Sequence, residues 1–217
     1  MSFGMTYEEM KGIMQMRLKP SRFRHSLGVA ETAEFLAHRF GADEQRARIA
    51  GLLHDCAREY RNEEMVHEAE RRGISIGMVE RAMPLLLHAG IGACLVRERY
   101  RVDDPAVEQA IRRHTVGGAG MTPLDKIIWF ADMIEPGRKY PEVEKLRRMA
   151  RESSLDEMVY EGLSDSLRFV LDKGNLIFEH TKHNAHNMSD EKAAAFIEKH
   201  CSDDILEHLF YLADQME

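Results

Sequence analysis

Apolar residues recur every three or four positions along almost the whole chain, and this spacing restricts the fold more than any other feature. Between residues 22 and 40 the apolar side chains that share one helical face are Phe23, Leu27, Ala30, Ala33, Ala37 and Phe40. Alternating β-branched segments typical of strands do not occur, and neither do the Asn-Gly or Asp-Gly pairs of tight hairpins. The pattern predicts an all-α protein.

Capping signals divide the chain into a series of predicted helices. Gly41 closes the helix over residues 22–40, and Asp43 is placed to cap the next one. Asp104-Pro105 and Thr122-Pro123 each combine a capping side chain with a proline in the first turn. The other predicted helices cover residues 6–18 (ended by Pro20), 62–72, about 89–99, about 154–174, about 190–200 and about 203–215.

The composition narrows the class of protein. The chain has 217 residues, of which 44% are hydrophobic and 31% charged, as in soluble globular proteins. The net charge of −7 disfavours a general nucleic-acid binder, so any anionic substrate must be held by local arginines or metal ions. No apolar run approaches the ~20 residues of a membrane helix. The start lacks the apolar core of a signal peptide, and three widely spaced cysteines form no disulfide framework. These features predict a cytoplasmic location and no membrane partner.

Eleven histidines are the most unusual part of the composition, and several lie beside apolar faces. His54-Asp55 directly follows residues 49–53, which are apolar all round and predict a central buried helix. A buried carboxylate without a partner costs at least several kcal/mol. A metal ion would satisfy such side chains together, because imidazole and carboxylate are ligands of iron, manganese and zinc. From spacing alone, hydrogen-bonded core histidines and a helix-capping aspartate remain alternatives. The other side chains concerned are His25, His88, His114 and Asp132.

In their order along the chain, these residues resemble the HD-domain phosphohydrolase superfamily, whose pattern is a histidine, a His-Asp doublet and a distant aspartate on separate helices. His88 and His114 are placed like the additional histidines of its binuclear members. The chain is more closely similar to the YqeK family of symmetrical bis(5′-nucleosyl)-tetraphosphatases, over roughly residues 18–187. The segments that carry this resemblance are Arg22–Ala30, Ala50–Asp55, His88 with Gly92-Ala93, Ala110–Gly117, Met121–Ile128 and Ala131–Arg138.

The resemblance implies an HD-domain helical bundle over residues 1–187, followed by a helical extension over 188–217 that packs on or near it. It implies a metal-dependent hydrolase that cleaves diadenosine tetraphosphate symmetrically into two ADP molecules, through a hydroxide bound to two divalent metal ions. Iron is the implied metal, with manganese or another divalent ion as an alternative. The implied partner is a nucleotide, and self-association into a homodimer stays open.

The resemblance also implies the site residues, each at the position of this chain that matches the family's motif. The implied metal ligands are His25, His54, Asp55, His88, His114 and Asp132, of which His54, Asp55 and Asp132 are also assigned to catalysis. The implied substrate-binding residues are His25, Arg58, His88, His114, Thr115, Arg138 and Thr181. Arg58 replaces the family's usual lysine, and arginine binds phosphate as a fork and not as a point charge. No carboxylate or cysteine cluster accompanies the evenly spaced His180, His183 and His186, which we interpret as part of a polar loop or helix end.

Two other functions stay open from the sequence. One is an HD-domain (deoxy)nucleotide phosphohydrolase of other specificity, and the second is a metal-bound module that senses nucleotides without turnover. The Gly-Tyr-Pro signature of cyclic-dinucleotide phosphodiesterases is absent. Arg58-Glu59 stands where guanosine-tetraphosphate hydrolases have an acidic pair. His88 and His114 argue against a monophosphatase that needs one metal.

Overall fold

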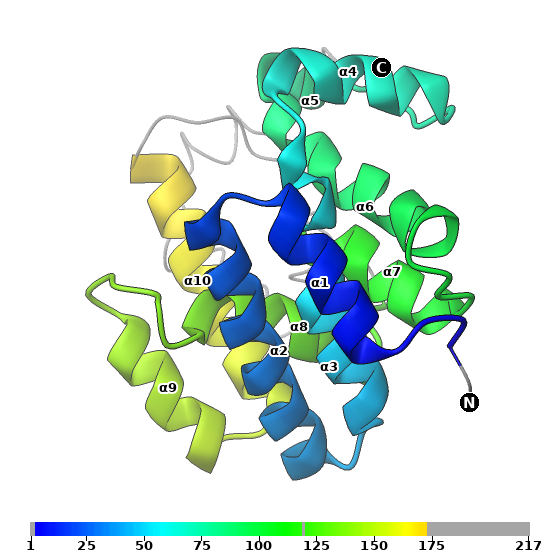
Figure 1. Ribbon diagram of the computed structural model, residues 1–217. Coiled ribbons are helices and arrows are strands. Elements are labelled where there is room, and N and C mark those ends of the chain that lie inside the picture. The colour runs from blue at the N-terminus through cyan, green and yellow to red at the C-terminus, as the bar shows by residue number, and fades with distance from the viewer. Residues whose placement is uncertain (1–2, 119, 173–217) are drawn as a thin grey trace.

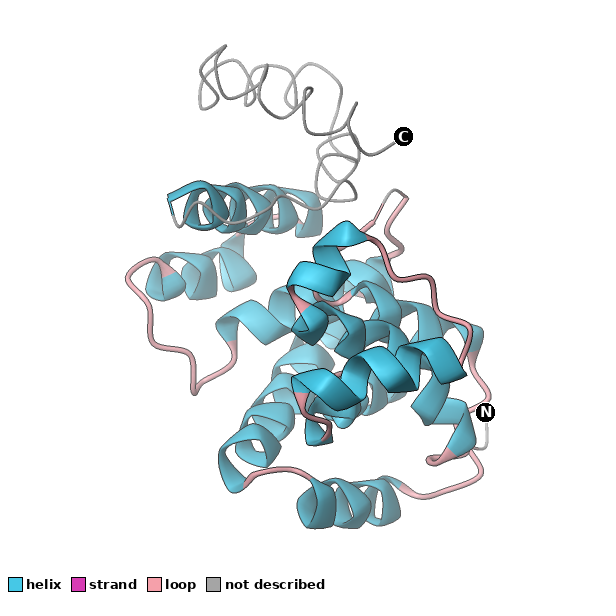
Figure 2. Cartoon of the chain, turned by 90° about the horizontal axis from the view of Figure 1, so that it is seen from above, coloured by secondary structure: helices cyan, strands magenta, loops and turns pink. Residues whose placement is uncertain are grey.

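The computed structural model describes residues 3–118 and 120–172, and within these ranges the chain forms helices, turns and loops without strands (Figures 1 and 2). The all-α prediction is confirmed. Two short 3₁₀ helices, η1 (Cys56–Glu59) and η2 (Pro84–Leu86), accompany ten α-helices in this part of the chain. The α-helices are α1 (Tyr7–Arg17), α2 (Pro20–Phe40), α3 (Glu44–Leu53), α4 (Asn62–Arg71), α5 (Met78–Ala82), α6 (Leu87–Glu98), α7 (Pro105–Arg113), α8 (Pro123–Ile134), α9 (Val143–Glu152) and α10 (Leu155–Asp172).

The core forms where α2, α3, α7 and α8 pack together. Helix α2 makes its most extensive contacts with α3 and also packs on α8, while α7 contacts α3, α6 and α8. Gly51 permits the close approach of α3 to α2, because a β-carbon at this position would lie 2.8 Å from the Cα atom of Ala30. Leu36, Leu52 and Ile127 are fully buried in this core. Helices α4 and α9 lie at opposite ends of the view in Figure 1.

Most predicted helix starts agree with the structure. The carboxylates of Asp43 and Asp104 and the hydroxyl of Thr122 accept hydrogen bonds from backbone N–H groups of α3, α7 and α8. Gly41 adopts a left-handed conformation with φ of 66°, as expected of a residue that ends a helix.

Two features differ from the sequence prediction. Pro20 begins α2 rather than only ending the preceding helix, because its fixed φ suits the first helical turn. Helices α5 and α9 were not predicted, and α9 buries only Val143, Leu146 and Ala150 in an otherwise polar segment. The predicted helices over 190–200 and 203–215, and the boundary between residues 187 and 188, lie outside the described residues.

Candidate metal centre

Four histidines from four separate parts of the chain direct their Nε2 atoms into one interior space. His25 lies on α2 and His88 on α6, whereas His54 and His114 are the first residues after α3 and α7. The Nε2 atoms of His25 and His54 are 3.2 Å apart. Those of His88 and His114 are 3.0 Å apart. The rings therefore form two pairs, each with its nitrogen atoms facing one another.

The second nitrogen of each ring is held by an oxygen acceptor. In His54, His88 and His114, Nδ1 donates to the backbone carbonyl three residues earlier. In His25, Nδ1 lies 3.0 Å from a carboxylate oxygen of Glu135. In a neutral ring a proton on Nδ1 leaves only a lone pair on Nε2, so the Nε2 atoms of His88 and His114 cannot hydrogen-bond to each other, whereas a cation would satisfy both. The three carbonyls belong to Gly51 (2.7 Å), Leu85 (2.5 Å) and Ile111 (2.6 Å).

Asp55 lies between the two pairs and presents a different oxygen to each. Its Oδ1 atom is 3.3 Å from Nε2 of His88 and 3.9 Å from Nε2 of His114. Its Oδ2 atom is 3.4 Å from Nε2 of His54 and 3.7 Å from Nε2 of His25. Burial acts to raise the pKa of Asp55, but the neighbouring imidazoles outweigh it and hold the pKa well below its ordinary value. The carboxylate is therefore ionised.

Asp132 adds a second carboxylate, which lies closest to the pair formed by His25 and His54. Its Oδ1 atom lies 3.0 Å from Nε2 of His25 and 3.9 Å from Nε2 of His54. Burial opposes ionisation, but the hydrogen bond with His25 and the charges of His54 and Arg138 keep the pKa of Asp132 below its ordinary range. The pair formed by His25 and His54 thus faces two carboxylates.

The donor set fits a divalent transition metal. Burial lowers the pKa of His88 and, with the neighbouring rings, lowers the pKa of His114 to about 3, so both rings are neutral as metal ligands must be. Imidazole nitrogen and carboxylate oxygen together suit iron, manganese and zinc. Three groups have ligand atoms that all lie within 4.8 Å of one another: His25–His54–Asp55, His54–His114–Asp132 and Asp55–His88–His114.

Three arginines lie beside the two carboxylates. Nη1 of Arg22 is 2.7 Å from Oδ2 of Asp55. Arg138 contacts the carboxylate of Asp132 and also donates from Nε to its backbone carbonyl at 2.7 Å. Arg58 is partly buried, and its guanidinium has no hydrogen-bond partner among residues 3–118 and 120–172. Burial and the charges of Arg22 and Arg138 lower the pKa of Arg58, against the opposing effect of the carboxylates.

Thr115 completes the group of predicted site residues that the structure brings together. Its Oγ1 atom lies 3.2 Å from Nε2 of His88 and 3.1 Å from Nε2 of His114. The predicted residues outside the described part of the chain are Thr181, for substrate binding, and the evenly spaced His180, His183 and His186.

Arg22 and Glu135 were not among the predicted site residues. Their spacing in the sequence was a usable signal: Arg22 precedes His25 by three positions, and Glu135 follows Asp132 by three positions. A glycine makes room for the second of these side chains, because a β-carbon on Gly28 would lie 2.6 Å from Oε2 of Glu135.

The helical bundle and its buried centre of histidines and aspartates are the features expected of an HD-domain protein. Comparison with known families gives the same assignment. The family model described as the HD domain matches residues 22–137, which include all six predicted metal ligands. The chain therefore belongs to the HD-domain family. No α-helix among the described residues combines the length and apolar character needed to cross a membrane.

Individual relatives give a narrower comparison. The symmetrical bis(5′-nucleosyl)-tetraphosphatase of Bacillus subtilis is 37% identical over 177 residues, which cover 82% of this chain and 94% of that protein. The protein of the same name from Halalkalibacterium halodurans is 38% identical over 169 residues, covering 78% and 89%. A crystal structure of a predicted HD superfamily hydrolase involved in NAD metabolism from Clostridium acetobutylicum aligns with a TM-score of 0.79 and 34% identity, covering 83% of this chain and 95% of that one. The resemblance inferred from the sequence motifs is confirmed.

Proposed function

We propose that this chain is a metal-dependent hydrolase that cleaves dinucleoside tetraphosphates symmetrically, so that diadenosine tetraphosphate yields two ADP molecules. The observation that carries the proposal is the buried set of four imidazoles and two carboxylates with three arginines beside it. The similarity to tetraphosphatases over most of their length favours this substrate over mononucleotides. The complete donor set favours turnover over nucleotide sensing alone.

The proposed cofactor is a pair of divalent ions, with iron as the metal and manganese as the alternative. Support for two ions comes from Asp55, which presents one oxygen to each imidazole pair. His25, His54 and Asp132 would hold one ion, and His88 and His114 would hold the other. When bound, such ions neutralise phosphate oxygens. They also lower the pKa of a bound water molecule to about 7, which supplies a nucleophile.

The chain's own side chains have distinct tasks in this proposal. The guanidinium of Arg58 has donors that no other described side chain uses, so it can bind a substrate phosphate through two parallel hydrogen bonds. Arg22 and Arg138 pair with Asp55 and Asp132, and their charges would help to stabilise the leaving ADP. The Thr115 hydroxyl, 3.2 Å from Nε2 of His88, would hydrogen-bond to a phosphate oxygen.

The wider setting is also part of the proposal. We infer a cytoplasmic enzyme whose partner is a nucleotide and not a nucleic acid, because the chain carries a net charge of −7 and its cysteines form no disulfide framework. The hydrolase domain would cover residues 1–187, with 188–217 as a helical extension and Thr181 as a further substrate contact. A homodimer is not required, since all six proposed ligands come from one chain.

Product analysis tests the proposal directly. Protein purified anaerobically and loaded with iron or manganese would be incubated with diadenosine tetraphosphate, and the products would be separated by ion-exchange chromatography. ADP as the sole product supports symmetrical cleavage. ATP with AMP would contradict it. Hydrolysis of mononucleotides without cleavage of the dinucleotide would favour the alternative phosphohydrolase, and bound metal without any turnover would favour the sensing module.

A further inference from the structure

Helix α8 ends two residues after Asp132, which it places at the metal centre. The helix stops at Ile134, and Glu135 adopts extended backbone with ψ of 155°. Pro136 explains the break, because its ring disfavours helical backbone in the residue before it. A helix end leaves backbone carbonyls without helical partners, and these must be satisfied by other groups.

Side chains supply those partners. The carbonyl of Asp132 accepts from Nε of Arg138 at 2.7 Å. The carbonyl of Met133 accepts from the hydroxyl of Tyr140 at 3.0 Å. The next carbonyls along the chain are bound by a side chain from a different helix.

That side chain is Arg147 on α9. Its Nε atom donates to the carbonyl of Ile134 at 2.9 Å, and its Nη2 atom donates to the carbonyls of Glu135 at 2.6 Å and Arg138 at 3.1 Å. Its remaining Nη1 atom is paired with Glu144 at 2.6 Å. The side chain is only 25% exposed. A cation at this end of α8 also complements the negative end of the helix dipole.

The segment held by Arg147 carries two side chains that contact metal ligands. Glu135 accepts a hydrogen bond from Nδ1 of His25, and its carboxylate also accepts from the backbone N–H of Gly137 at 2.5 Å. Arg138 contacts the carboxylate of Asp132. Both ligands belong to the same side of the centre, since Nε2 of His25 lies 3.0 Å from Oδ1 of Asp132.

We propose that Arg147 is a positioning residue of the metal centre. It fixes the backbone of residues 134–138, so that Glu135 orients the His25 ring and Arg138 orients Asp132. The inference rests on the ligand assignments of the proposed function and not on its substrate. It is restricted to one half of the centre, because His88 and His114 are oriented by carbonyls of η2 and α7.

A matched pair of arginine variants tests this role. Arg39 on α2 also binds a backbone carbonyl, that of Ser153 at 2.7 Å, and is also partly buried, but it lies outside the metal centre. We would measure Mn²⁺ affinity of metal-free protein by calorimetry for Arg147→Met and Arg39→Met. Loss of an outer partner of a metal ligand typically weakens binding 10- to 100-fold, so we expect about 10-fold weaker binding in Arg147→Met. Arg39→Met should bind as the wild type does.

Arg147→Lys provides a second variant in case the methionine variant does not fold. Lysine keeps the charge but lacks the planar fork that serves several carbonyls, so we expect a smaller loss of Mn²⁺ affinity than in Arg147→Met. Unchanged Mn²⁺ affinity in the folded Arg147 variants would overturn the inference. An equal loss in Arg39→Met would also overturn it, because the effect would then follow from general stability.

A double-mutant cycle with Glu135→Gln locates the effect. If Arg147 acts through Glu135, the two losses in Mn²⁺ affinity will be less than additive, whereas additive losses would overturn that route. Calorimetry measures Mn²⁺ binding in the absence of substrate hydrolysis. A wild-type protein that binds Mn²⁺ but leaves diadenosine tetraphosphate intact would therefore contradict the proposed function and not the role of Arg147.

Discussion

The Nε2 atoms of His88 and His114 face each other at 3.0 Å, while the carbonyls of Leu85 and Ile111 already hold both Nδ1 protons. The hydroxyl of Thr115 can donate to only one of these Nε2 atoms. Burial lowers the pKa of both rings, that of His114 to about 3, so neither ring carries a second proton near neutral pH. A bound cation would satisfy both Nε2 atoms.

Metal removal should accordingly destabilise the protein. A ligand at 100 times its dissociation constant stabilises the native state by about 2.7 kcal/mol, so we expect chelation to lower Tm by several degrees and Mn²⁺ to restore it. Differential scanning calorimetry before and after chelation measures the change. The control is His114→Gln, in which added Mn²⁺ should raise Tm less than in the wild type. An unchanged Tm on chelation would contradict the metal assignment.

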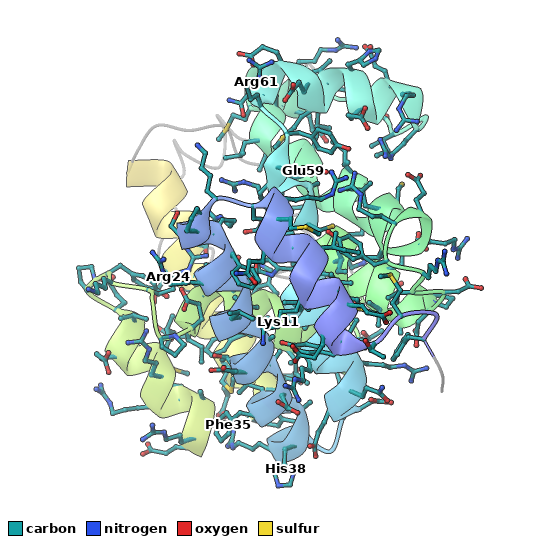
Figure 3. All side chains as sticks on the ribbon, in the orientation of Figure 1. Lys11, Arg24, Phe35, His38, Glu59 and Arg61 are labelled. Atoms are coloured by element: carbon teal, nitrogen blue, oxygen red, sulfur yellow. The ribbon has the colours of Figure 1, made fainter. Side chains whose placement is uncertain are left out.

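His54→Ala should abolish turnover and retain helix content. The side chain is fully buried between both carboxylates, and the alanine removes a nitrogen donor from the centre. His38→Ala is the matched control, because His38 lies at the far end of α2 with 79% of its side chain exposed (Figure 3). Steady-state kinetics and circular dichroism of both variants test the prediction. Full activity in His54→Ala would refute the ligand role.

Arg58→Gln should raise KM for the dinucleotide more than it lowers kcat. Hydrogen bonds to charged groups contribute about 1.5 to 3 kcal/mol, so kcat/KM should fall roughly 10- to 100-fold. Arg61→Gln provides the comparison, since Arg61 lies at the start of α4 (Figure 3), is 78% exposed and pairs with Glu64. The kinetic constants of both variants decide the matter, and equal effects would exclude a specific phosphate contact at Arg58.

Asp104→Ala should destabilise the fold in a pH-dependent manner. The Asp104 carboxylate pairs with Arg46 at 2.8 Å and accepts from the N–H group of Ala106 at 3.0 Å. Burial opposes ionisation, but these partners lower the pKa of Asp104 below the ordinary value of an aspartate. Its contribution is therefore fully present above that value and is lost as pH falls through the lower pKa of the folded state.

Urea unfolding of metal-free protein at neutral and acidic pH measures this contribution. We expect Asp104→Ala to lose about 1 to 2 kcal/mol of unfolding free energy at neutral pH, with a smaller difference from the wild type in acid. Asp103→Ala is the control, because Asp103 is 82% exposed. A loss that stays constant as the pH falls would disprove the electrostatic part of the explanation.

The fold was largely predictable because its helix ends carry strong local signals. Asp43, Asp104 and Thr122 are caps that can be recognised from a few residues, and the structure confirms each of them. Helix α9 was not predicted because most of its residues are polar, although Val143, Leu146 and Ala150 recur at helical spacing. Its contribution is a long-range contact between Arg147 and carbonyls at the end of α8, which no local pattern encodes.

The candidate site was predictable in its residue types but not in its arrangement. Histidines and aspartates beside apolar faces indicated a metal centre, and the family resemblance implied the ligand set. Which oxygen of Asp55 faces which imidazole pair depends on how α2, α3, α6 and α7 pack. Glu135 escaped notice because its partner, His25, lies 110 positions earlier in the chain.

Gly51 links the packing of the core to the assembly of the metal centre. Because a β-carbon at Gly51 would lie 2.8 Å from the Cα atom of Ala30, its absence lets α2 and α3 pack closely, and the same packing holds His25 beside His54. The entropy of assembling these ligands is thus lost during folding and not during metal uptake. The centre is therefore preorganised by a position that has no side chain, and uptake of an ion requires little further ordering of α2 or α3.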